Sequence, residues 1–308
     1  MSRLGAWLKE RRSLKEHRKE EGAERISQMT ATCRLETQIP ELEAANLQGM
    51  GSRTEQQDAF ALSKLDQYEE QGILAVLCDG MGGMAEGGRI ARQTVAEILS
   101  AFPWKDDSVI QEKIREISQS VYRQFCGHGG ATLVAALLRE NQLSFWCVGD
   151  SDLFLLRDDS LYALNIRQEF RNELLLRALE GVFPPEKAYA DPQAGALSEY
   201  IGKELLRIDA TRKPFVLQPE DTLLLCSDGV SDTLTLKQIR EAMKEDPFNC
   251  CSRMEKEILE AAKPNQDNYT AIVLKYHGKQ ETEKQKTEKQ KTEKQEMEND
   301  EGKVGVKR

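Results

Sequence analysis

Hydrophobic residues along this chain gather in short runs of strand length that are separated by polar turn residues. The runs cover residues 73–78, 132–138, 143–148, 153–156, 222–226 and 269–276. Pairs such as Glu140-Asn141 and Asp158-Asp159 stand between neighbouring runs, and residues of this kind favour tight turns. The pattern predicts strands at these positions, several of them joined as antiparallel hairpins.

Other segments repeat their hydrophobic residues at helical spacing. This spacing predicts two helices between residues 87 and 125, and two more around 236–243 and 252–262. Helices that alternate with blocks of hairpins indicate an α+β fold in which the helices pack on antiparallel sheets. The segment 165–212 breaks the pattern with Pro184-Pro185 and an Asp-Pro step, and its two helical stretches predict an inserted flap.

The two ends of the chain differ from this middle part. Residues 1–45 are densely charged, so we expect a solvated helix or a disordered arm; a basic helix that touches an acidic membrane or partner is the alternative. Residues 278–308 include repeats of Lys-Thr-Glu-Lys-Gln with almost no hydrophobic side chains, which predicts a loose helix or coil. The expected folded domain therefore covers residues 46–277.

Composition limits the class of protein. With 308 residues and 39% hydrophobic content, the chain can bury a sizeable core, and a net charge of -9 disfavours general binding to nucleic acid. No apolar run approaches the ~20 residues of a membrane span, and the N-terminus lacks the apolar core of a signal peptide. The seven cysteines are scattered and are expected to be buried free thiols in a reducing cytoplasm; a redox site at Cys250-Cys251 is the alternative.

Acidic residues stand within two positions of the end of three of the expected strands. Asp79, Asp150 and Asp228 each come after a hydrophobic run, and two of them are followed by glycine. A strand end holds a carboxylate rigidly, while glycine lets carbonyl groups and water approach a cation closely. Each aspartate alone is more simply a turn residue. The repeated design favours a site for hard cations such as Mg²⁺ or Mn²⁺.

Two other features receive simpler interpretations. With only His17, His128 and His277 in the chain, a His-rich zinc site is excluded, and His128 between two glycines is expected to be a turn residue. The glycine-rich stretch 80–88 lacks the spacing of a nucleotide-binding loop, so we interpret it as room for a metal cluster.

Six short motifs carry a resemblance. In chain order they are Arg53-Thr-Glu-Gln-Gln-Asp58-Ala, Leu77-Cys-Asp79-Gly-Met-Gly-Gly83, Gly130-Ala-Thr132, Val148-Gly-Asp150-Ser151, Leu225-Cys-Ser-Asp228-Gly229 and Gln266-Asp267-Asn268-Tyr-Thr270. Together and in this order, they resemble the metal-dependent protein phosphatases of the protein phosphatase 2C type, across about residues 47 to 276 and in neither arm.

The resemblance implies a four-layer αββα sandwich, in which two antiparallel sheets flanked by helix pairs hold a metal cluster at one end. Asp79 would bridge two Mn²⁺ or Mg²⁺ ions, helped by the Gly80 carbonyl. Asp58 would reach one of these ions, and Asp228 and Asp267 would hold the other.

Two further roles follow from the same resemblance. Asp150, together with Asp228, matches a possible third and weaker metal position. Arg53 would clamp the substrate phosphate, a role that suits the two-pronged guanidinium group. The implied reaction is attack on the phosphoryl group by a metal-activated water, with no covalent enzyme intermediate.

Three departures from the family pattern are present. Gln57 stands where many members have Glu, which removes one negative charge near the metals. Met81 stands where eukaryotic members have His, as it does in bacterial members. The stretch 165–169 lacks the Asp-His-Ser that often follows this strand, so the shape of the flap is expected to differ.

We therefore expect a cytoplasmic, monomeric enzyme that hydrolyses phosphoserine and phosphothreonine in proteins and opposes a bacterial Ser/Thr kinase. One alternative is a catalytically weak, phosphatase-like regulatory module that binds phosphoproteins, which Gln57 would favour. Another is a nuclease or nucleotide hydrolase with an acidic site, but the sequence does not obviously supply the basic surface that such an enzyme needs.

Overall fold

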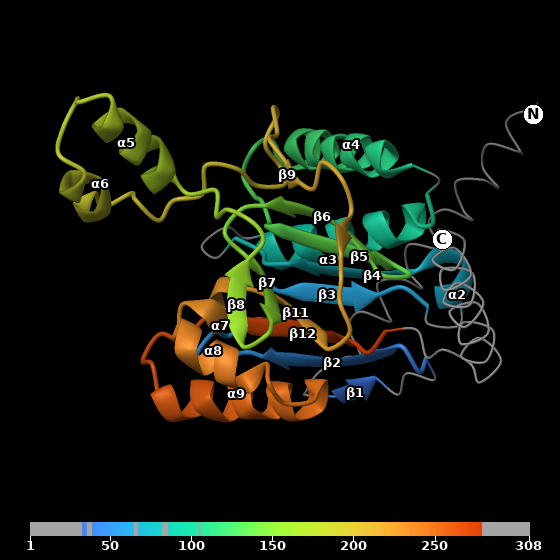
Figure 1. Cartoon of the computed structure of the whole chain (residues 1–308). Helices are drawn as coiled ribbons and strands as arrows, with labels where there is room; N and C mark the ends of the chain where they lie inside the picture. The colour runs from blue at the N-terminus through green and yellow to red at the C-terminus, as the bar shows by residue number, and fades with distance from the viewer. Residues whose placement is uncertain (1–32, 36–38, 65–66, 82–85, 105, 279–308) are drawn as a thin grey trace, which may run out of the picture.

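Two antiparallel sheets form the centre of the molecule (Figure 1). The structure, a computed structural model, describes residues 33–35, 39–64, 67–81, 86–104 and 106–278. The first sheet has the order β1 (Cys33–Leu35), β2 (Leu42–Gly49), β12 (Tyr269–Tyr276), β11 (Asp221–Cys226), β7 (Asp152–Arg157), β8 (Ser160–Ala163). The second has the order β10 (Phe215–Val216), β6 (Gln142–Val148), β5 (Leu133–Arg139), β4 (Ile73–Cys78), β3 (Ala59–Leu62), with β9 (Asp209–Ala210) also on β6.

The hydrophobic side chains of the strands alternate between two packing layers. In β4, Ile73, Ala75 and Leu77 pack into the layer between the sheets, whereas the residues between them pack on the opposite face, against helices. Successive side chains of a strand point to opposite faces, and here both faces are covered. This explains why β4 is a continuous hydrophobic run and not an alternating one.

A pair of helices covers the outer face of each sheet, as Figure 1 shows. Helices α3 (Gly87–Ala101) and α4 (Asp107–Phe125) pack on the second sheet, and α8 (Leu236–Ala242) and α9 (Pro247–Ala261) pack on the first. The short helix α2 (Tyr68–Gln71) lies between β3 and β4, and the short helix α7 (Asp228–Ser231) lies between β11 and α8. The expected αββα sandwich is confirmed.

Most predicted elements are present, with small shifts at their ends. The limits of β4 and β12 are those predicted, while α9 begins at Pro247, earlier than residue 252, because Asp246 caps it by accepting a hydrogen bond from the Asn249 amide. Strands β2 and β3 were not predicted. Strand β1 at Cys33–Leu35 and strand β2 from Leu42 belong to the first sheet, so the sandwich starts ahead of the expected boundary at residue 46.

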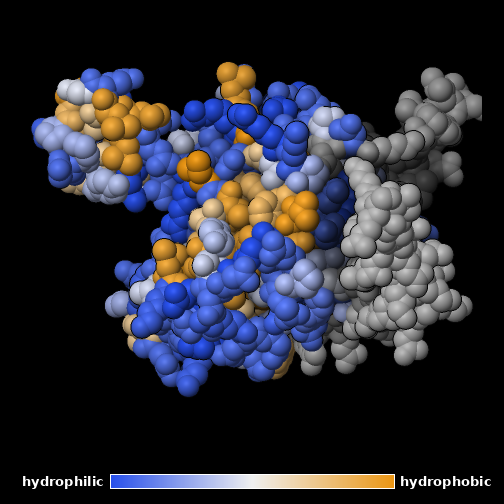
Figure 2. Space-filling model, in the orientation of Figure 1, coloured by the Kyte–Doolittle hydropathy of each residue, from blue (hydrophilic) through white to orange (hydrophobic). Residues whose placement is uncertain are grey.

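The flap predicted at 165–212 contains two helices, α5 (Phe170–Leu179) and α6 (Glu186–Ala190), which project from the sandwich at the left of Figure 1. Several large side chains on it are exposed: Leu176, Leu179, Val182 and Tyr189. Figure 2 shows hydrophobic surface on this part of the molecule, at the upper left. The segment returns to the second sheet at β9, just before its predicted end.

The cysteines and the chain ends complete the comparison with the sequence. Cys78, Cys147, Cys226, Cys250 and Cys251 are free and buried as expected, but Cys126 is exposed because it lies at the end of α4 in a left-handed conformation. No helix in the described ranges is long and apolar enough to span a membrane. The predictions for residues 1–32 and 279–308 lie outside the described residues.

Candidate metal centre

Strand pairing brings the predicted acidic residues to one end of the two sheets. In the second sheet Ala59 pairs with Cys78, so Asp58 and Asp79 are neighbours just beyond the paired residues. In the first sheet Cys226 pairs with Ala271, so the segments that hold Asp228 and Asp267 also leave their strands at a common edge. The predicted residues are therefore far apart in sequence but adjacent at the strand ends.

Asp58 connects the two sheets at this end. Its Oδ2 accepts a hydrogen bond from Ser227 Oγ at 2.9 Å and another from Thr270 Oγ1 at 2.7 Å. Thr270 lies in β12 of the first sheet, and Ser227 directly follows β11 of the same sheet. Its other oxygen, Oδ1, is buried and has no hydrogen-bond partner. Burial raises the pKa of Asp58 to about 7, against the lowering effect of these two hydrogen bonds. Oδ2 is thus held by two hydrogen bonds, whereas Oδ1 remains available to a further partner.

Asp79 lies at the centre of the acidic cluster. Burial and then repulsion from Asp58, Asp228 and Asp150 raise the pKa of Asp79 well above its ordinary value. Its carboxyl lies close to those of Asp58 and Asp228. Repulsion between these crowded like charges destabilises the folded protein, and a bound cation would relieve this repulsion.

The backbone of Asp79 is also tied to the loop that contains Asp150. The Asp79 amide donates to Thr132 Oγ1 at 2.9 Å, and the Thr132 hydroxyl shares a hydrogen bond of 2.7 Å with the Ser151 hydroxyl. Ser151 directly follows Asp150. These hydroxyls explain why Thr132 and Ser151 belong to the motifs, a role that the sequence did not reveal.

Asp150 and Asp228 form the other side of the cluster. Burial and repulsion from Asp228 raise the pKa of Asp150 to about 7. Burial, followed by repulsion from Asp232 and Asp267, also raises the pKa of Asp228. The Oδ1 atom of Asp228 is buried without a hydrogen-bond partner, as in Asp58. Both carboxyls lie in a place that disfavours their charged form unless a positive charge is near.

The remaining two predicted residues contact each other. Arg53 donates from Nη2 to Asp267 Oδ2 at 2.6 Å, and both side chains are more than one-third exposed. Arg53 therefore lies at the rim of the acidic cluster.

Two glycines of the motifs allow the surrounding loops to pack tightly. A Cβ atom on Gly80 would lie 2.3 Å from the carbonyl carbon of Gly87 and 2.7 Å from Gln57 O. On Gly229 it would lie 1.9 Å from Asn268 O. Since real Cβ atoms do not approach other atoms this closely, larger residues would force apart the loops that hold Asp58, Asp79 and Asp228.

The residues of this cluster fit a divalent cation. Two buried carboxylate oxygens lack any partner, and the donors are carboxylates, which Mg²⁺ and Mn²⁺ prefer. Within the described ranges, no group of three or more His, Cys, Asp or Glu side chains is arranged to hold one ion alone.

The other two features noted in the sequence do not add to the site. His128 is exposed in the turn after α4, and its amide donates to Phe125 O at 2.9 Å, so it is a turn residue as expected. Residues 82–85 of the glycine-rich stretch lie outside the described residues.

Sequence comparisons agree with this geometry. The profile of the protein phosphatase 2C family matches residues 50–267. The chain is similar to the serine/threonine phosphatase stp of Listeria innocua, with 29% identity over 187 residues that cover 56% of this chain and 71% of the relative. It is also similar to the serine/threonine protein phosphatase PstP of Mycobacterium tuberculosis, with 31% identity over 212 residues, 65% of this chain and 40% of the relative.

Solved structures share the fold. The crystal structure of the Mycobacterium tuberculosis serine/threonine phosphatase PstP/Ppp superposes with a TM-score of 0.64 at 25% identity, covering 77% of this chain and 99% of that one. The catalytic domain of PstP in complex with two manganese ions gives a TM-score of 0.61 at 25% identity, over 76% and 98% of the two chains.

Proposed function

Because this chain belongs to the protein phosphatase 2C family, we propose that it is a metal-dependent phosphatase acting on phosphoserine and phosphothreonine in proteins. The relatives that it resembles are named serine/threonine phosphatases. The fold is the one that those enzymes use, and the motifs of the family lie together at one end of the sandwich.

One observation carries the proposal. Asp58 Oδ1 and Asp228 Oδ1 are buried oxygens without partners on either side of Asp79, whose own pKa is raised by burial and by the neighbouring carboxyls. A cluster of this kind is costly in a protein without cations and favourable in one that binds them. Mn²⁺ or Mg²⁺ fits the oxygen donors, and two ions are proposed, as in the neighbouring structure with two manganese ions.

Each residue has a part in the reaction. When bound, the cations would activate a water for attack on phosphorus and neutralise the phosphoryl oxygens. Asp79 would hold both ions, with the Gly80 carbonyl, while Asp58 would hold one and Asp228 and Asp267 the other. Arg53, at the rim, would bind the phosphate oxygens and orient the ester for in-line attack. Since Met81 has no titratable group, the leaving group takes its proton from water.

The finer context is also part of the proposal. Asp150 with Asp228 would hold a third, weaker ion. The substrates are phosphorylated proteins in a pathway with a bacterial Ser/Thr kinase, and the enzyme acts as a monomer in the cytoplasm. The five buried free thiols are consistent with a reducing compartment.

The decisive experiment is hydrolysis of a phosphothreonine peptide in millimolar Mn²⁺, with EDTA as the blank. The proposal expects turnover that depends on Mn²⁺ and that is lost in Asp79→Asn. A folded protein that binds the phosphopeptide but never hydrolyses it would instead support a regulatory module. Activity confined to nucleotides or nucleic acid would place the chain in a different class of hydrolase.

A further inference from the structure

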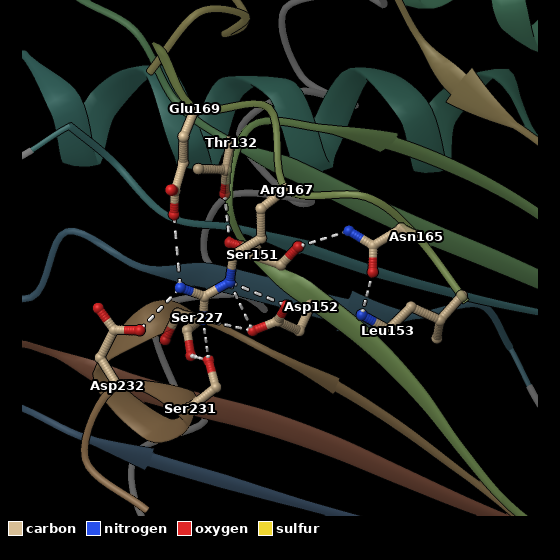
Figure 3. A network of polar contacts seen from close by, with 10 residues as sticks. All are labelled: Thr132, Ser151, Asp152, Leu153, Asn165, Arg167, Glu169, Ser227, Ser231 and Asp232. Carbon is tan, nitrogen blue, oxygen red and sulfur yellow. Dashed lines mark hydrogen bonds and ion pairs between the residues drawn. The ribbon is translucent and has the colours of Figure 1, made fainter. Parts of the chain in front are cut away.

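Arg167, at the start of the flap, lies in a dense network of polar contacts (Figure 3). Its Nε and Nη2 donate to the two carboxylate oxygens of Asp152 at 3.0 and 2.6 Å. Its Nη1 donates to Asp232 Oδ1 at 2.8 Å, and Nη2 also donates to Ser231 Oγ at 2.7 Å. The guanidinium group therefore uses its whole planar fork, on partners from two different segments.

These partners flank two of the acidic residues of the candidate metal centre. Asp152 lies two positions after Asp150, at the start of β7, and Asp232 follows α7, whose first residue is Asp228. The Asp232 amide donates to the Asp228 carbonyl at 2.7 Å, so the two residues are linked through one short turn. Arg167 thus joins the loop of Asp150 to the helix of Asp228.

Neighbours of Arg167 hold the same loop from the same side. Asn165 donates from Nδ2 to Ser151 O at 2.9 Å and accepts from the Leu153 amide at 2.7 Å. Gln168 accepts from the Gly149 amide with Oε1 and donates to the Gly149 carbonyl with its own amide, both at 2.8 Å. The loop is already fixed against the start of the flap, and Arg167 extends this contact to α7.

We propose that Arg167 is a positioning residue whose planar guanidinium group fixes the distance between Asp150 and Asp228, so that the two carboxylates can share a cation. The inference rests on the metal binding in the proposed function. Its ordinary alternatives are a buried ion pair that only stabilises the flap, and a positive charge that simply repels a cation bound nearby.

The geometry favours positioning over a purely electrostatic role. A lysine has the same charge but forms no planar fork, and it cannot reach two carboxylates and a hydroxyl with the spacing of a guanidinium group. Loss of the fork should therefore change the separation of the two loops even when the charge is kept. Substitution of residues that orient metal ligands typically weakens metal binding by about 10–100-fold.

The test is a calorimetric Mn²⁺ titration of the full chain, comparing the unchanged protein with Arg167→Lys, Arg167→Gln and Asp150→Asn. Asp150→Asn identifies the part of the binding that depends on Asp150. Both Arg167 variants are expected to weaken that part by about tenfold or more and to leave the remaining Mn²⁺ binding unchanged.

Arg157→Lys is the matched control. Arg157 forms a similar fork on the buried carboxylate of Asp221, at the opposite end of β7 from Asp152. The Arg157→Lys substitution should lower the melting temperature and leave all Mn²⁺ binding unchanged. This control separates a loss of positioning from a general loss of stability.

Four results would overturn the inference. The first is wild-type Mn²⁺ affinity in Arg167→Lys, and the second is tighter Mn²⁺ binding in Arg167→Gln. The third is that the Arg167 variants bind every Mn²⁺ ion more weakly by the same factor. The fourth is that Asp150→Asn binds Mn²⁺ like the unchanged protein. Phosphopeptide hydrolysis by the unchanged protein is measured separately. Its absence would reject the proposed function. An active enzyme with any of the first three results rejects only the role of Arg167, and with the fourth result it also rejects the third ion at Asp150.

Discussion

Arg53 and Asp267 form an ion pair of 2.6 Å at the rim of the acidic cluster. The motifs give these residues different roles, one toward the phosphate of the substrate and the other toward a cation. Because the pair is more than one-third exposed, its own contribution to stability is small. The pair holds Arg53 beside the cluster, where the proposed function has its guanidinium group bind the substrate phosphate.

Arg53→Ala should lower kcat/KM for a phosphothreonine peptide by about 10–100-fold, since a hydrogen bond to a charged group is worth about 1.5–3 kcal/mol. Steady-state kinetics in saturating Mn²⁺ provides the measurement. Arg115→Ala is a suitable control, because Arg115 has almost the same exposure and an ion pair with Glu112 on α4. Equal kinetics of the two variants would show that Arg53 does not contact the phosphate.

Asp79→Asn should remove activity and stabilise the metal-free protein. The substitution removes the central carboxylate, so we expect at least about a 100-fold loss of turnover. It also removes a charge that burial and four neighbouring aspartates disfavour. Steady-state kinetics tests the loss of activity, and urea denaturation in EDTA tests the gain in stability. Wild-type turnover in this variant would show that the metal assignment is wrong.

Thr270→Val should weaken Mn²⁺ binding about tenfold without unfolding the protein. Thr270 donates to Asp58 Oδ2 at 2.7 Å, so its loss leaves the carboxylate with Ser227 as its remaining hydroxyl donor. Thr270→Ser keeps the hydroxyl and should bind Mn²⁺ like the unchanged protein. If Thr270→Val and Thr270→Ser bound Mn²⁺ with the same affinity in calorimetric titrations, Thr270 would not orient Asp58 for a cation.

The stability of the metal-free protein should fall between about pH 4 and pH 7. The pKa of Asp58 is raised in the folded state to about 7 from an ordinary 3.8, so the folded protein binds a proton more tightly than the unfolded chain. The stabilising effect of this proton is complete below pH 4 and is lost as the pH rises through 7.

Asp58→Asn removes this titration, since its amide oxygen can still accept from Ser227 and Thr270. The free energy of unfolding of the variant should exceed that of the unchanged protein by about 1–4 kcal/mol at pH 8 and by much less at pH 4. Urea denaturation in EDTA at both pH values measures the difference. A gain that is the same at pH 4 and pH 8 would contradict the raised pKa.

The sequence predicted the fold best where both faces of a strand are covered. Strand β4 is uniformly hydrophobic and β12 is mostly so, and their limits could be predicted well. Strand β2 was missed although it lies next to β12 inside the sheet. Its residues include Glu43, Asn46 and two alanines, which have weak strand preference, and partners from distant parts of the chain complete its pairing.

The candidate site was predicted unevenly for a similar reason. The aspartates were identified because each stands at a strand end within a recognisable motif. The hydroxyls of Ser227 and Thr270 are in those motifs too, but their contact with Asp58 joins segments that only the packing of the two sheets brings together. The stretch 165–169 stood out only as a departure from the family pattern, and the contacts of Arg167 could not be predicted, because a single arginine in a loop resembles any surface residue.

The position of β12 between β2 and β11 has a consequence for how the protein is made. Gln48 and Thr270, which contact each other across these strands, are 222 residues apart in sequence. On a ribosome, the first sheet cannot close until residues 269–276 have emerged, and such distant pairing is slow because a long loop must close first. The nascent chain therefore cannot assemble its catalytic end early, and a product truncated before β12 would be inert.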